Sequence, residues 1–220
     1  MSTPVENWFA QAVEYHRVGN LERAKDLYNQ ILGMQSDHDG VLHNLAMMAL
    51  QQGNREEALI YLERAVDAAP DSSLILFSYG KTLFEAGERL SALPPLERTL
   101  ALEPNNIQAM LMVADISRQL GQHDKSCQYY QQASVSVTDN PVLYTNWANS
   151  LLELGQFEEA RARFLQAVEV DPIAVKAMND LGMALRQRDL NSEAEQWFHR
   201  AINQRSDYST ASINLGDLLL

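Results

Sequence analysis

The stretch LGQFEEARARFLQAVEVDP, residues 154–172, has the pattern of an amphipathic helix that follows a glycine and ends at a proline. The stretch QQGNREEALIYLERAVDAAP, residues 51–70, repeats those landmarks at the same spacings. In both, an alanine stands five residues after the glycine, and a large apolar residue and a second alanine follow it. Two helices with the same residue types at the same spacings indicate an internal repeat. The period of that repeat identifies the fold.

The repeat has a period of 34 residues and runs without an insertion from residue 5 to residue 208. Its turn position holds Gly19, Gly53, Gly87, Gly121, Gly155 and finally Asp189. Five residues later stands a small residue, at Ala24, Ala58, Ala92, Ser126, Ala160 and Ala194. Four residues further stands a large one, at Tyr28, Leu62, Leu96, Tyr130, Phe164 and Phe198. Seven residues before the turn, a small residue recurs at Ala12, Ala46, Gly80, Ala114, Ala148, Gly182 and Gly216.

These positions describe a pair of helices joined by a tight turn. A small residue on each helix lets the two helices approach closely, and the large residue fills the space beside that contact. Glycine, and to a lesser degree aspartate, permits the left-handed backbone conformation of the turn. Such a pair cannot bury both of its apolar faces alone, so we expect successive pairs to stack on one another.

The pattern resembles the tetratricopeptide repeat family, whose units are helix–turn–helix pairs of 34 residues. The resemblance is clearest in residues 141–174, which carry Trp147, Ala148, Gly155, Ala160 and Pro172 at the family's positions. It implies an all-α fold, a right-handed superhelical solenoid of about 13 antiparallel helices. We expect a single domain over residues 1–220, with units at 5–38, 39–72, 73–106, 107–140, 141–174 and 175–208. Residues 209–220 would be the first helix of a seventh unit.

Two stretches depart from the pattern. Pro94 and Pro95 fall in the second helix of residues 73–106, where they remove two backbone donors and disfavour helical geometry at Leu93. We expect that helix to start late or to bend. The segment ASVSVTDN, residues 133–140, is poor in helix formers, which predicts the weakest seam between two units at that place.

The composition limits the classes of partner. Hydrophobic residues make up 46% of the chain, and the net charge of −12 argues against nucleic acid and against anionic membrane surfaces. The single cysteine, Cys127, excludes an intramolecular disulfide. The first residues lack the pattern of a signal peptide, and no apolar stretch is long enough to span a membrane. We therefore expect a cytoplasmic protein without membrane insertion.

No motif for catalysis or for a cofactor stands out in the sequence. It has neither a glycine-rich phosphate loop nor a zinc-binding helix motif, and its five histidines are spread over different parts of the repeats. The neighbouring carboxylates Glu158 and Glu159 begin a second helix, where negative charge complements the helix dipole. We expect no enzyme activity within these residues, no cofactor and no metal.

The resemblance places the candidate site on the concave side, which this family lines with the first helix of each pair. The groove-facing positions of the family are the second, fifth, sixth, ninth, twelfth and thirteenth of each unit. The sixth position holds Asn44, Ser78, Asn146, Asp180 and Asn214, with interruptions at Ala10 and Met112. Further groove candidates are His43, Met47, Lys81, Asn149, Lys176 and Asn179.

The column of amides at the sixth position resembles the asparagine ladder in the repeat arm of O-linked N-acetylglucosamine transferases, including their bacterial relatives. An amide offers donors and acceptors without charge and can therefore hydrogen-bond the backbone of an extended peptide. We expect Asn44 and Asn146 to be available for such a partner, so that replacing them weakens binding without lowering stability.

We expect a protein-interaction module or scaffold that binds a peptide or a helix of a protein partner in this groove. One alternative is the N-terminal substrate- or partner-recognition arm of a larger enzyme, because the repeats resemble those that precede bacterial glycosyltransferases and sulfotransferases. A second alternative is a self-assembling scaffold. The apolar stretch SINLGDLLL, residues 212–220, would then associate through the C-terminal edge, unless the natural chain continues and covers it.

Overall fold

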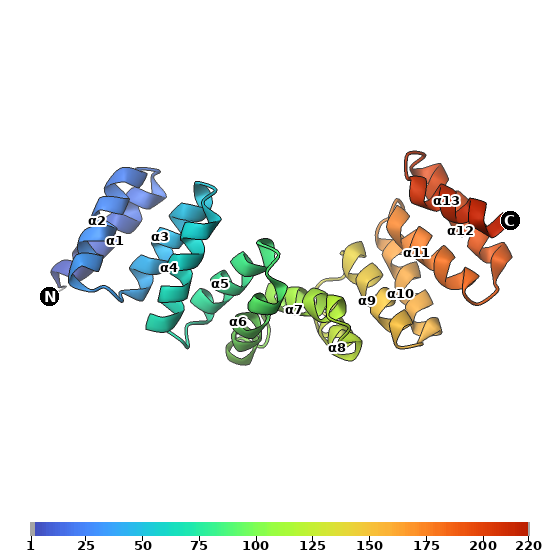
Figure 1. Cartoon of the computed structure of the whole chain (residues 1–220), viewed down its shortest axis with the longest axis horizontal. Coiled ribbons are helices and arrows are strands. Elements are labelled where there is room, and N and C mark those ends of the chain that lie inside the picture. The colour runs from blue at the N-terminus through green and yellow to red at the C-terminus, as the bar shows by residue number, and fades with distance from the viewer. Residues whose placement is uncertain (1–2, 220) are drawn as a thin grey trace. The chain divides into compact units, whose positions relative to one another are not determined.

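The computed structural model describes residues 3–219, which form thirteen α-helices and no strand (Figure 1). The chain divides into two compact units, residues 1–109 and 110–220. The first unit holds α1 (Pro4–Arg17), α2 (Leu21–Met34), α3 (Asp39–Gln51), α4 (Arg55–Ala68), α5 (Ser73–Glu85) and α6 (Arg89–Leu102). The predicted all-α class, built from antiparallel helix pairs, is confirmed.

The division between the units falls in the first turn of α7 (Ile107–Gln119). The second unit continues with α8 (His123–Ser134), α9 (Pro141–Glu153), α10 (Phe157–Val170), α11 (Val175–Arg186), α12 (Asn191–Gln204) and α13 (Ser209–Leu219). Within this unit α9 packs against both α10 and α11, and α11 packs against both α12 and α13. First helices of successive pairs are therefore neighbours, as stacked pairs require.

The turn within each pair has the left-handed residue that the sequence predicts. The five turn glycines have φ between 73° and 85°, and Asp189 is the one described non-glycine residue with positive φ, at 60°. The N–H of the next residue bonds back across the turn, as Gln156 does to the carbonyl of Leu151 at 2.9 Å. This bond satisfies a carbonyl at the end of the first helix, which is why the turn stops the helix cleanly.

The core of each pair is a contact between a small residue and a large one. A Cβ added at Gly80 would lie 2.7 Å from Cγ of Leu96, and one added at Gly182 would lie 2.6 Å from Cε1 of Phe198. Leu96 and Phe198 are themselves fully buried. The helices of these two pairs therefore approach so closely that no side chain larger than hydrogen fits at the contact.

The two prolines do not delay the start of α6. The helix begins at Arg89, in register with the other second helices, and contains Pro94 and Pro95. The expected late start is therefore wrong. The missing donors would have bonded the carbonyls of Leu90 and Ser91, two exposed residues in the first turn of the helix.

The seam expected at residues 133–140 coincides with a short helix. α8 ends at Ser134 after 12 residues, whereas the other five second helices each have 14. Val135, directly after it, is 81% exposed. The weak helix formers of this segment thus shorten α8 by half a turn before Asn140 caps α9 through its side chain.

The close contact at Gly182 can be tested against Gly216, which stands at the same repeat position but meets nothing within 4 Å. Gly182→Ala should lower the free energy of unfolding by about 1–2 kcal/mol, because the overpacking cost exceeds the gain in helix propensity. Gly216→Ala should leave it unchanged or raise it. Urea unfolding followed by circular dichroism measures both variants, and equal losses would contradict the contact.

At the left-handed turn residue Asp189, a substitution should raise the free energy of unfolding, whereas Gly182→Ala should lower it. Asp189→Gly should raise the free energy of unfolding by about 0.5–1 kcal/mol, because glycine adopts positive φ without a Cβ clash. Gly155→Asp, made at φ 74°, should lower it by a similar amount. Thermal melts of the two variants beside the parent chain test this, and a stability loss for Asp189→Gly would show that the aspartate has another role.

Candidate functional site

The predicted groove residues all lie on first helices, and the surface that the first helices form within each unit is called the first-helix face of that unit. α1, α3 and α5 form it in the first unit, and α7, α9, α11 and α13 form it in the second. In the first unit these residues are His43, Asn44 and Met47 on α3, with Ser78 and Lys81 on α5. In the second they are Asn146 and Asn149 on α9, Lys176, Asn179 and Asp180 on α11, and Asn214 on α13.

One cleft in the first unit gathers four of these residues. It lies between α3 and α5, has a volume of about 290 Å³, and is called the α3/α5 cleft. Its lining residues are His43, Met47, Leu50, Leu74, Phe77, Ser78, Lys81, Thr82 and Glu85. Leu74 is 61% exposed although it is a large apolar side chain. The cleft is thus an apolar trough with a few polar groups, the composition typical of sites that take an apolar side chain.

The polar groups of the α3/α5 cleft are paired with one another across and along the helices. Nε2 of His43 and Oγ of Ser78 lie 3.0 Å apart and join α3 to α5. Burial lowers the pKa of His43, although Asp39 opposes this, so the neutral imidazole is the favoured form at pH 7. Lys81 and Glu85 lie 3.9 Å apart, and the two charges offset each other at the rim.

Two clefts of different character lie between α9 and α11 in the second unit. The apolar cleft, of about 220 Å³, is lined by Pro141, Val142, Thr145, Asn146, Asp171, Ile173, Ala174, Val175, Lys176 and Ala177. The polar cleft, of about 460 Å³, is lined by Asn149, Leu152, Glu153, Asp180, Met183, Ala184 and Gln187. Residues of α9 and α11 line both clefts, and the two clefts together are called the α9/α11 seam.

Most of the predicted amides in the second unit are bonded to a neighbouring repeat. Nδ2 of Asn146 donates to Asp115 on α7 at 3.0 Å, and Nδ2 of Asn149 donates to Asp180 on α11 at 3.0 Å. Nδ2 of Asn214 donates to the side-chain oxygen of Asn179 at 2.8 Å. These bonds tie successive first helices together, and Asn146 uses one of its N–H groups inside the stack.

The two carboxylates that accept these hydrogen bonds, Asp115 and Asp180, also accept hydrogen bonds from other donors. Lys176 donates to Asp180 at 2.5 Å, and Asn179 does so at 3.3 Å. Asp115 also accepts the hydroxyl of Tyr130, whose pKa is raised by burial and then by this neighbouring carboxylate. Both carboxylates are therefore structural acceptors within the stack.

Asn44, the amide predicted in the first unit, is turned onto its own helix. Its Nδ2 donates to the carbonyl of Gly40 at 2.9 Å. Each of the asparagines Asn44, Asn146 and Asn149 still has a second N–H and a side-chain oxygen beyond the bonds described. The amide column can therefore contact a partner, but with fewer groups than the sequence suggests.

Several lining residues were not singled out from the sequence. They include Leu50 and Glu85 in the α3/α5 cleft, and Val142, Ile173, Glu153 and Gln187 in the α9/α11 seam. Leu50, Val142, Glu85, Glu153 and Gln187 occupy the second, twelfth or thirteenth position of their units. These repeat positions are groove-facing in the family, so the repeat pattern could have identified the five residues. Ile173 lies in the turn before α11, and no column pointed to it.

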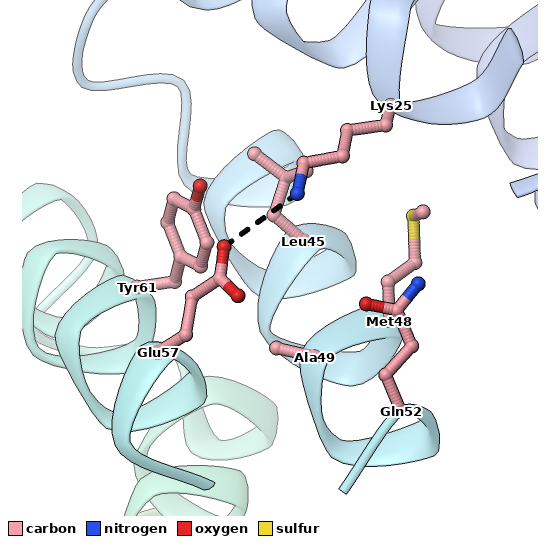
Figure 2. A pocket seen from close by; sticks show the side chains of 7 residues that line it. All are labelled: Lys25, Leu45, Met48, Ala49, Gln52, Glu57 and Tyr61. Atoms are coloured by element: carbon pink, nitrogen blue, oxygen red, sulfur yellow. Dashed lines mark ion pairs between the residues drawn. The ribbon is translucent and has the colours of Figure 1, made fainter. Parts of the chain in front are cut away.

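A further space in the first unit is too small for a ligand. Figure 2 shows Lys25 of α2 reaching toward Glu57 of α4, 3.7 Å apart, with Tyr61 beside them and α3 residues below. The space that they enclose has a volume of about 10 Å³, room for about one water molecule. The residues around it form part of the packing contact between two neighbouring helix pairs.

Metal-binding clusters and the single thiol were two possible sources of catalytic groups. In residues 3–219 no group of three or more His, Cys, Asp or Glu side chains is arranged to hold a metal ion. Burial raises the pKa of the Cys127 thiol to about 11, so the thiol is protonated at neutral pH. Over the same range no helix is long and apolar enough to cross a membrane.

Models of the tetratricopeptide repeat match residues 16–76, 107–134 and 145–220. The matches fall in both compact units and touch every predicted repeat copy, although only residues 73–76 of the copy at 73–106 are matched. The chain belongs to the tetratricopeptide repeat (TPR) family. The resemblance expected from the 34-residue period is thereby confirmed.

The chain is similar to relatives and solved structures of diverse kinds. The Vi polysaccharide export protein VexE of Salmonella typhi is 26% identical over 76% of this chain, and the chain spans 26% of VexE's length. The structure of MamA from Desulfovibrio magneticus RS-1 is 21% identical, with a TM-score of 0.71, and covers 78% of this chain and 98% of its own. YrrB, described as a TPR protein with an unusual peptide-binding site, is 17% identical, with a TM-score of 0.77, and covers 85% and 96%.

Replacing an asparagine that hydrogen-bonds a neighbouring repeat should lower the stability of the fold. Replacing a residue without such a bond should not. Asn149→Ala should lower the free energy of unfolding by about 1–2 kcal/mol, because it removes a bond to a carboxylate between α9 and α11. The control is Gln187→Ala in the same cleft, where the exposed side chain makes no hydrogen bond within residues 3–219. We expect that control to change stability by less than about 0.5 kcal/mol. Urea unfolding measures both, and an unchanged Asn149→Ala variant would contradict a structural role.

Proposed function

We propose that this TPR protein is a protein-interaction module that binds a peptide or a helix of a partner on its first-helix face. The observation that carries this is the α3/α5 cleft, where apolar side chains of two successive first helices form a trough of about 290 Å³. Such a trough accepts an apolar anchor residue, and the polar groups at its rim fix the orientation of the partner.

The comparisons support the same role. YrrB, of similar fold, is described as having a peptide-binding site, and its repeats superimpose on most of this chain. Within residues 3–219 there is no metal-binding cluster, and the Cys127 thiol has a raised pKa, so neither feature favours an enzyme. A cytoplasmic location, the absence of nucleic-acid partners and the part of a longer protein to which these repeats could belong stay predictions.

A photo-crosslinking amino acid placed at chosen positions tests the proposal. At Met47 in the α3/α5 cleft and at Met183 in the polar cleft it should capture a partner from a cell extract. At Glu63 on α4 and Glu169 on α10, exposed positions of second helices, it should not.

Mass spectrometry of the adducts identifies what is captured. Equal capture from first and second helices would contradict the proposed face. Adducts between two copies of this chain would favour the self-assembling scaffold instead.

A further inference from the structure

The α9/α11 seam has an apolar end and an acidic end. At the apolar end, Val142 is 63% exposed and Ile173 is 62% exposed, two large side chains that face a cleft of about 220 Å³. Small residues, Ala174 and Ala177, line the same cleft and leave space between them. An apolar side chain of a partner would remove both exposed residues from water, which is favourable by burial alone.

At the other end, the only charged side chains that line the polar cleft are carboxylates, Glu153 and Asp180. Asp180 is already held by Lys176 and Asn149. Glu153 is exposed, and the structure gives it no hydrogen bond or ion pair within residues 3–219. The net charge of −12 adds a field that attracts cations. The charge that complements this end is therefore positive.

Between the two ends runs a single stripe of α9. Val142, Asn146, Asn149 and Glu153 follow one another at helical spacings of four, three and four residues, so they share one face of the helix. Asn146 and Asn149 each use one N–H in the stack and keep an oxygen and a second N–H. Those groups can pair with a peptide backbone that crosses from the apolar end to the acidic end.

The length of this stripe sets the distance between the apolar residue and the basic residue of a bound peptide. Val142 and Glu153 are about three helical turns apart, or about 16 Å. An extended chain advances about 13 Å over four residues and places residues four apart on the same side. The reach of a lysine or arginine side chain covers the remaining distance. An α-helical ligand would hide its backbone from the two amides, which favours an extended one.

We propose that the α9/α11 seam selects an extended peptide segment with an apolar residue and a lysine or arginine four positions apart. This inference rests on the proposed function and names its ligand class for the second unit. The α3/α5 cleft does not share this preference, because Lys81 and Glu85 offset each other there.

A library of randomised nine-residue peptides, selected against the full chain at low ionic strength, tests the inference. The enriched peptides should carry an apolar residue and a basic residue four positions apart, in either order. Fluorescence anisotropy of the best labelled peptide should show about a two- to fivefold weaker affinity for Glu153→Gln, the size expected for an exposed ion pair. Val142→Ser should weaken it about three- to tenfold through lost apolar contact.

The matched control is Glu159→Gln, which removes the same charge from an exposed position on α10 in the same unit. It should leave the affinity unchanged, and circular dichroism should show all three variants folded. Enriched peptides without a basic residue, or peptides that bind Glu153→Gln as well as the parent, would overturn the inference and leave the proposed function standing. A library that yields no binder at all would overturn both.

Discussion

The structure depends on a contact between a small residue of one helix and a large residue of its partner. Gly80 against Leu96 and Gly182 against Phe198 leave no room even for a methyl group, and alanine occupies the same place in other pairs. Because the two helices of a pair lie so close together, the pair still has apolar side chains on its outer faces. A neighbouring pair must cover these faces, so the pairs stack. The tight turn of left-handed φ sets the two helices at the spacing that the contact requires.

A polar layer on the first helices complements this apolar core. In the second unit, amides and carboxylates of α7, α9, α11 and α13 bond one another from repeat to repeat. Side chains that would otherwise serve a ligand are thus used to fix the register of neighbouring pairs. The surface that remains open lies at the two ends of the α9/α11 seam, where apolar and acidic side chains face unfilled space.

The two units offer different chemistry on the same kind of surface. The α3/α5 cleft is mainly apolar, with a histidine kept neutral by burial and charges of both signs at its rim. The α9/α11 seam separates its apolar and acidic parts along the helices. In the proposed interaction module the two surfaces would favour different ligands, because specificity arises from differences between such contacts.

The sequence by itself determined the helices, their pairing and the family, because those depend on residue size and backbone conformation at fixed spacings of a few residues. It also placed His43, Met47, Ser78 and Lys81 on facing positions of two first helices, and the structure brings them into one cleft. Only the tertiary structure decided which neighbour each polar side chain binds. Asn146 turns back to Asp115 while Asn149 turns forward to Asp180, although both are asparagines of one helix. A repeat pattern cannot distinguish these choices, because the direction of a flexible polar side chain is set by the partners that the neighbouring repeats place within hydrogen-bonding reach.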